Sequence, residues 1–278
     1  MALASILGSG MACKRRVDPP PPTPVRILSG SYALADVVHQ ASRQYVVPVW
    51  LSESQQPYEG LAPDAKLTER VGEADLIVMG SAIESRFIDV ESRLISADRV
   101  LRLPIPEKSD WPTNAALWMD PQIVRSILPD LADRLARRRP RLEAHFREGV
   151  SRIDQSLGAL LDELQTTSET IQSSAILTLD TRPWPLLARL GARWSYLPVD
   201  TARPLGVEEI AQVRSAARDR EASVLVLPAD LPGAMRESIG QRARMRAVAI
   251  DVLGRPGTDY FSILRNGLRA LIEAAASG

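Results

Sequence analysis

The residues of this sequence best suited to binding a metal ion or to acid/base catalysis are a few carboxylates, two of which follow apolar runs. Asp180 follows the run 176–179, Asp251 closes the run 248–250, and Glu59 lies in a polar loop. Open α/β sheets bind ligands at the carboxyl ends of their strands. Hard cations prefer oxygen ligands. If the three side chains converge, Glu59, Asp180 and Asp251 form a candidate metal site.

Two other uses of these carboxylates remain open. Acidic residues after strands commonly cap the next helix or face solvent. Alternatively, Asp180 and Asp251 could act as an acid/base pair, because two nearby carboxylates can be driven to different pKa values. A strongly apolar cleft around the pair would favour this catalytic interpretation, and a solvated cleft would not.

The usual signatures of enzymes are missing from the chain. It has no G-x-S-x-G elbow, no phosphate-binding loop with its lysine, no H-E-x-x-H motif and only one cysteine. Histidine is the commonest general base, and the two histidines, His39 and His145, have no suitable nucleophile near them in the sequence. The sequence therefore predicts a binding protein that is not an enzyme.

Charge and composition argue against a nucleic-acid partner. Lysine plus arginine total 34 and aspartate plus glutamate total 34, while aromatic residues make up 5%. Nucleic-acid binders usually carry a basic excess and often aromatic stacking platforms. No internal apolar run approaches the roughly 20 residues that a membrane-spanning helix needs.

The first 24 residues are predicted to form a leader and a linker. A short apolar stretch ends at Cys13, and basic residues and the proline-rich run 19–24 follow. This resembles a bacterial lipoprotein signal, in which the cysteine receives lipid and a stiff linker tethers the domain. The resemblance implies membrane contact through a lipidated Cys13 and a periplasmic or otherwise extracytoplasmic location. The alternative is an uncleaved, disordered leader.

Strand and helix patterns alternate through both halves of the remaining chain, which predicts parallel sheets built from βαβ units. Strands are expected over 25–28, 45–51, 75–79 and 100–103, and then over 175–179, 194–198, 223–227 and 247–252.

Between the halves, apolar residues spaced three or four apart predict one long helix over 140–166, about 40 Å in length. The predicted fold class is therefore α/β with two lobes, each a small parallel sheet flanked by helices, joined by one long helix. The expected divisions are a leader and linker over 1–24, an N-terminal lobe over 25–139, the connecting helix over 140–166, and a C-terminal lobe over 167–278.

Several segments resemble those of the zinc- and manganese-binding solute-binding proteins of bacterial ABC importers. They are ADLIVMG at 74–80, continuing to Glu84, WMDP at 118–121, and AVAID at 247–251. Their order and spacing match over nearly the whole folded chain. The resemblance implies that the protein captures a divalent metal ion, zinc or manganese, between two lobes and delivers it to a membrane permease.

The chain departs from that family at the metal ligands. The family typically holds its metal with three histidines and a carboxylate. The loop 55–59 has no histidine, and the second and third histidine positions hold Ala116 and Asp180. Only the carboxylate, Asp251, is retained. Loss of the imidazoles removes the donors that favour zinc.

Altered or lost metal selectivity is therefore expected, and three outcomes remain open. The cleft could bind a harder cation through Glu59, Asp180 and Asp251, or a different small ligand. It could also bind nothing, which would make the chain a non-metal interaction or scaffold protein on the same fold.

Overall fold

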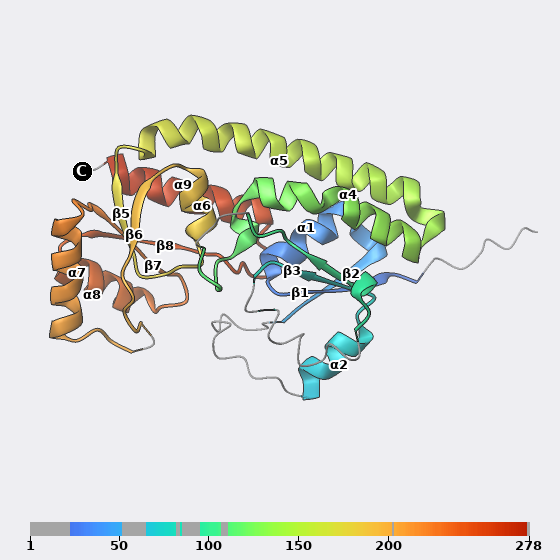
Figure 1. Cartoon of the computed structure of the whole chain (residues 1–278), viewed down its shortest axis with the longest axis horizontal. Helices are drawn as coiled ribbons and strands as arrows, with labels where there is room; N and C mark the ends of the chain where they lie inside the picture. The colour runs from blue at the N-terminus through green and yellow to red at the C-terminus, as the bar shows by residue number, and fades with distance from the viewer. Residues whose placement is uncertain are drawn as a thin grey trace, which may run out of the picture.

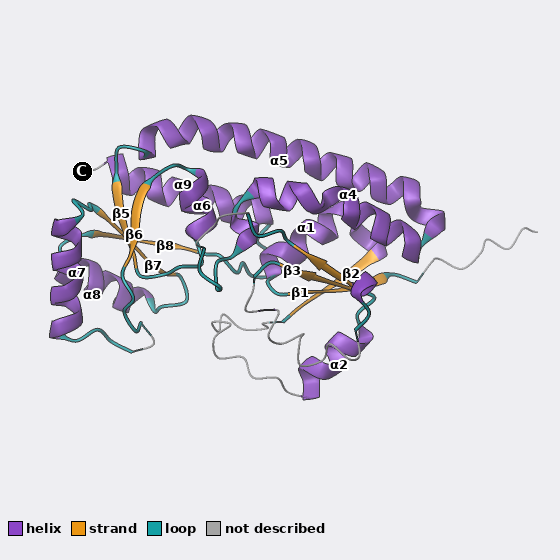
Figure 2. Cartoon of the chain, in the orientation of Figure 1, coloured by secondary structure: helices purple, strands orange, loops and turns teal. Residues whose placement is uncertain are grey.

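The computed structural model describes residues 23–51, 65–81, 84, 95–106, 111–201 and 203–276. Glu59 and most of the helix expected over 84–95 lie outside these residues. The described chain forms two four-stranded sheets with helices around each of them (Figure 2). This confirms the predicted α/β class. None of the described helices is both long and apolar enough to cross a membrane.

The first sheet has the strand order β2-β1-β3-β4, and its strand pairs are parallel. Its central strands are buried along almost their whole length, as expected of strands covered on both faces. The helices α1 and α2 flank this sheet (Figure 1). The elements are β1 (Val25–Ser29), α1 (Tyr32–Ser42), β2 (Val46–Trp50), α2 (Ala65–Glu73), β3 (Leu76–Met79) and β4 (Val100–Arg102).

The second sheet repeats this arrangement with the order β6-β5-β7-β8, again with parallel pairs. A separate apolar cluster lies under α7 and α8, while α6 and α9 pack into the main core. The elements are β5 (Ala175–Thr178), α6 (Trp184–Arg189), β6 (Arg193–Tyr196), α7 (Val207–Asp219), β7 (Val224–Pro228), α8 (Gly233–Ala243), β8 (Arg246–Ile250) and α9 (Tyr260–Ala276).

Two long helices lie between the two sheets in the chain order. In α4 (Pro121–Arg138), Asp120 caps the first turn by accepting a hydrogen bond of 2.9 Å from the backbone N–H of Gln122. A short 3₁₀ turn (Pro140–Leu142) leads into α5 (Glu143–Ile171), because Pro140 is tolerated only at the start of a helix. The long helix predicted for 140–166 is thus found, and it runs past both sheets (Figure 1).

One face of α5 carries the apolar stripe that the sequence showed. Phe146, Ile153, Leu157, Leu160 and Leu164 are all buried in a core that includes residues of both halves. The backbone also approaches α1 closely, since a Cβ atom on Gly149 would lie 1.6 Å from the carbonyl oxygen of Ala41. The boundaries between the leader, the lobes and the connecting helix remain a prediction.

The junction between the sheets is held by buried hydrogen bonds. The indole N–H of Trp118 donates to the carbonyl oxygen of Val252 at 2.6 Å, and the hydroxyl of Tyr260 donates to the carbonyl oxygen of Trp118 at 2.7 Å. Burial raises the pKa of Tyr260 well above its usual value, and the charge of Asp120 raises it further, so the hydroxyl keeps its proton. These links restrict relative movement of the two halves.

Candidate functional site

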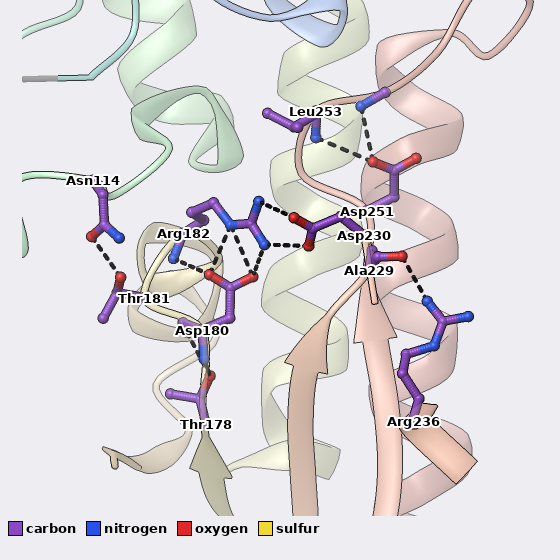
Figure 3. Close-up of polar contacts among 11 residues, drawn as sticks. Asn114, Thr178, Asp180, Thr181, Arg182, Ala229, Asp230, Arg236, Asp251 and Leu253 are labelled. Atoms are coloured by element: carbon purple, nitrogen blue, oxygen red, sulfur yellow. Dashed lines mark hydrogen bonds and ion pairs between the residues drawn. The ribbon is translucent and has the colours of Figure 1, made fainter. Parts of the chain in front are cut away.

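The candidate site lies at the carboxyl edge of the second sheet, where three loops follow β5, β7 and β8 (Figure 3). The loop after β5 is shaped by local hydrogen bonds. The hydroxyl of Thr178 donates to the carbonyl oxygen of Asp180 at 2.6 Å and accepts from the Asp180 N–H at 3.0 Å. The Asp180 carboxylate then accepts from the backbone N–H of Arg182 at 2.9 Å, as in an Asx turn.

The Arg182 side chain joins two of these loops. Its Nε donates to both oxygens of Asp180, at 2.9 and 3.1 Å. Its Nη2 lies 2.9 Å from Asp180 Oδ2 and 2.7 Å from Oδ1 of Asp230, in the loop after β7. The exposed fractions of the three side chains are 9% for Arg182, 4% for Asp180 and 15% for Asp230. A buried guanidinium therefore lies between two carboxylates.

Electrostatics keep this guanidinium charged. Burial alone would lower the pKa of Arg182, but the charges and hydrogen bonds of Asp180 and Asp230 raise it far above its usual value. Breaking a buried ion pair leaves an uncompensated charge and costs about 3–5 kcal/mol. Arg182 is thus a fixed cation at this edge of the sheet.

Asp251 shapes the turn after β8. Its Oδ1 accepts hydrogen bonds from the backbone N–H groups of Leu253 and Gly254, at 3.1 and 2.9 Å. Gly254 adopts a φ of 70°, which favours glycine. The carbonyl oxygen of Leu253 accepts a hydrogen bond of 2.9 Å from Ala33 at the start of α1. Asp251 therefore supports the contact between the two halves.

A cavity of about 250 Å³ opens beside these groups. Its wall is rich in arginine and also includes two carboxylates. The lining residues are Arg182, Ala229, Asp230, Arg236, Ala249, Asp251, Val252, Leu253 and Arg255.

The structure brings Asp180 and Asp251 to the same sheet edge, as the sequence predicted, whereas Glu59 lies outside the described residues. Ala116 is also nearby and buried, and its backbone N–H donates to the carbonyl oxygen of Arg182 at 3.0 Å. Within the described ranges, no three histidine, cysteine, aspartate or glutamate residues are grouped so that they could hold a metal ion. The assignment of Glu59, Asp180 and Asp251 as ligands remains a prediction.

Sequence reasoning missed Arg182 and Asp230. Asp230 follows β7 as Asp180 follows β5, so the rule that selected Asp180 could also have selected Asp230. Arg182 stands only two residues after Asp180 in the sequence. Neither signal shows that one guanidinium joins both carboxylates, because that contact depends on the strand order.

The chain matches a model of a known protein family. The family model described as a periplasmic zinc-uptake complex component A matches residues 27–274. A search of curated proteins found no match.

Solved structures give matches to the fold at low sequence identity. The metal-dependent lipoprotein YcdH from Bacillus subtilis is 13% identical with a TM-score of 0.75, over 90% of this chain and 99% of that one. The periplasmic zinc-binding protein TroA from Treponema pallidum is 16% identical with a TM-score of 0.73, over 91% and 99%. Zn(II)-bound AdcA from Streptococcus pneumoniae is 12% identical with a TM-score of 0.73, and this chain covers 58% of its length.

Proposed function

The chain belongs to the family of periplasmic zinc-uptake component A proteins, and from this premise we propose that it is a ligand-capturing protein whose metal selectivity is altered or lost. The family consists of metal-binding solute-binding proteins of ABC importers, which are transport components and not enzymes. The resemblance drawn from the sequence and the expectation of a non-enzyme are thus confirmed. In the proposal, the ligand enters the cavity at the second sheet edge and is passed to a membrane permease.

One observation carries the altered selectivity. The Arg182 guanidinium lies between Asp180 and Asp230, at the sheet edge that also carries Asp251. Zinc favours imidazole and thiolate ligands, and the described residues that line the cavity include no histidine or cysteine. A single positive charge about 4 Å from the guanidinium would be repelled by that group by roughly 4 kcal/mol at an effective dielectric constant near 20, and the two carboxylates that could offset this repulsion are already paired with Arg182.

The family match supports the proposal of an extracytoplasmic location. The description of the matched family is periplasmic, and YcdH is described as a lipoprotein. In this chain, lipid on Cys13 would anchor the protein through the proline-rich linker. The linker enters the fold beside Arg139, whose Nε donates to the carbonyl oxygen of Thr23 at 2.7 Å.

The buried links between the halves restrict how the ligand is enclosed. The side chains of Trp118 and Tyr260 join the two halves through hydrogen bonds. Asp251 shapes the turn whose Leu253 carbonyl oxygen accepts a hydrogen bond from Ala33 in the other half. We therefore expect a small closure on ligand binding. A pair of structures that showed wide hinge opening would contradict this expectation.

A melting curve of the metal-free protein tests the proposal. Zinc, manganese, iron or calcium is added at saturation, and a ligand at about 100 times its dissociation constant adds roughly 2.7 kcal/mol. That corresponds to about 5–10 °C at 2–4 °C per kcal/mol. We expect no preferential rise with zinc. A selective rise with a harder cation, lost in Asp180→Ala and Asp251→Ala, would identify altered selectivity. No rise with any cation would identify lost selectivity, and a large rise with zinc alone would overturn the proposal.

A further inference from the structure

The cavity beside Arg182 contains more unused hydrogen-bond donors than acceptors. Arg182 is already satisfied by Asp180 and Asp230. Arg236 donates through Nη1 to the carbonyl oxygen of Ala229 at 2.7 Å, and its Nε and Nη2 make no hydrogen bond within the described residues.

The Arg255 side chain, which is exposed, makes no hydrogen bond or ion pair in the described part of the chain. Two guanidinium groups on the cavity wall therefore have spare donors.

The cavity has fewer free hydrogen-bond acceptors than free donors. Oδ1 of Asp251 is occupied by the backbone N–H groups of Leu253 and Gly254. Its Oδ2 accepts no hydrogen bond from the described residues, so it can accept one from a hydroxyl group. The Asp230 carboxylate is already paired with Arg182. The free groups thus suit a ligand with anionic oxygens and one hydroxyl donor.

Guanidinium groups bind carboxylates through charge-assisted and frequently bidentate hydrogen bonds. The cavity volume of about 250 Å³ lies just below the usual range of about 300–1,000 Å³ for drug-sized ligands, which favours a small molecule. From these observations we infer that the cavity binds a small hydroxy-polycarboxylate, either free or as its chelate with a divalent metal ion. The inference rests on the proposed function and names the ligand class of the same site.

Binding of the chelate would explain how a protein of a metal-importing family can have a cavity lined by three arginines. A bare divalent cation would meet the guanidinium groups of Arg236 and Arg255, which have no ion-pair partner among the described residues. Asp230 is already paired with Arg182, and Asp251 offers one free carboxylate oxygen. A metal ion that is already coordinated by the carboxylates of a chelator forms a neutral or anionic complex, which these guanidinium groups can bind. In that case the protein supplies the outer contacts, and the carboxylate ligand supplies the metal donors.

Calorimetric titration of the full-length, metal-free protein tests this ligand class. The probes are citrate, an equimolar zinc–citrate or manganese–citrate complex, and each bare cation. Tricarballylate, which lacks the hydroxyl of citrate, tests the contact with Asp251. We expect citrate or its chelate to bind, and tricarballylate to bind several-fold more weakly. Equal binding of citrate and chelate identifies the free carboxylate as the ligand, whereas binding of the chelate alone identifies the complex.

Three variants test the residues. Arg236→Ala and Arg255→Ala should each weaken binding by at least tenfold, and Arg236→Lys should restore part of the affinity because it keeps the charge. Arg218→Ala is the matched control, since Arg218 is an exposed arginine on α7 outside the cavity. Circular dichroism checks that each variant is folded.

Two results would overturn the inference. Binding of a bare cation alone, unchanged in Arg236→Ala and Arg255→Ala, would exclude the carboxylate ligand and leave the proposed function standing. Absence of binding with every probe would exclude the inference and would also count against ligand capture at this site.

Discussion

The two sheets have the same strand order, yet the described residues at their carboxyl edges differ in chemistry. The first edge carries Ser29 at the end of β1, Gly30 and Ser31 after it, and Gly80 and Ser81 after β3. The second carries Asp180 and Arg182 after β5, Asp230 after β7 and Asp251 after β8. The same topology thus places small neutral residues directly after β1 and β3, where the Glu84 carboxylate accepts hydrogen bonds from the backbone after β3, and a cluster of arginine and aspartate side chains in the other half.

The small residues of the first edge allow close packing. A Cβ atom on Gly80 would lie 2.3 Å from Cε3 of Trp118, so a side chain cannot be added without displacing the indole. Glu84 accepts hydrogen bonds from the backbone N–H groups of Gly80 and Ser81 through Oε2, at 2.5 and 3.2 Å. Among the described residues, the first edge therefore stabilises the junction, and the second edge carries the charged groups of the proposed binding site.

The largest effect should come from breaking the charged cluster. Arg182→Ala leaves Asp180 and Asp230 buried without their partner, so the free energy of unfolding should fall by about 3–5 kcal/mol. Urea denaturation at neutral pH measures this loss. A loss below about 1 kcal/mol would mean that the cluster is solvated, and the contrast between the two edges would then be wrong.

A smaller effect is expected at the first edge. Gly80→Ala should lower the free energy of unfolding by about 1–3 kcal/mol, because the added methyl group meets Trp118. Gly72→Ala is the matched control: Gly72 lies on α2, and a Cβ atom there has no neighbour within 4 Å. That change should be neutral or stabilise the protein by up to about 1 kcal/mol. Equal losses in both variants would contradict the close approach at Gly80.

The cap of α1 gives a third, weaker test of the first edge. The Ser31 Oγ accepts a hydrogen bond of 3.1 Å from the backbone N–H of Leu34. Ser31→Ala should therefore cost about 1 kcal/mol, as for other helix caps, while ligand binding at the second edge should be unchanged. If Ser31→Ala altered ligand affinity without altering stability, the first edge would have to be included in the binding site.

The smallest effect is expected at an exposed pair. The hydrogen bond and charge of Arg125, 2.7 Å away, lower the pKa of Asp154. A lowered pKa means that the stabilisation is present above the unfolded pKa and is lost as the pH falls through the folded pKa. Asp154→Asn should thus lower the free energy of unfolding by less than the variants above. The loss should be seen at neutral pH, where Asp154 is ionised, and should disappear at acidic pH, where Asp154 is protonated. A loss as large as that of Arg182→Ala would remove the distinction between buried and exposed pairs.

The sequence predicted the fold well because its signals are local. Apolar runs marked the strands, and the spacing of Phe146, Ile153 and Leu157 marked the long helix. The same reasoning placed Asp180 and Asp251 at strand ends, where the structure also has them. It could not predict that Arg182 joins Asp180 to Asp230, because this contact depends on the adjacency of β5 and β7. Nor could it predict that Asp251 uses one oxygen to hold a backbone turn.

The zinc affinity of the metal-free wild-type protein should be measured by competition with a chromophoric zinc chelator. We expect that the protein does not withdraw zinc from the chelator, because Arg182 holds Asp180 and Asp230 and no imidazole is among the described residues that line the cavity. Tight zinc binding that Asp180→Ala abolished would show that the guanidinium does not block the site, and it would contradict the central claim.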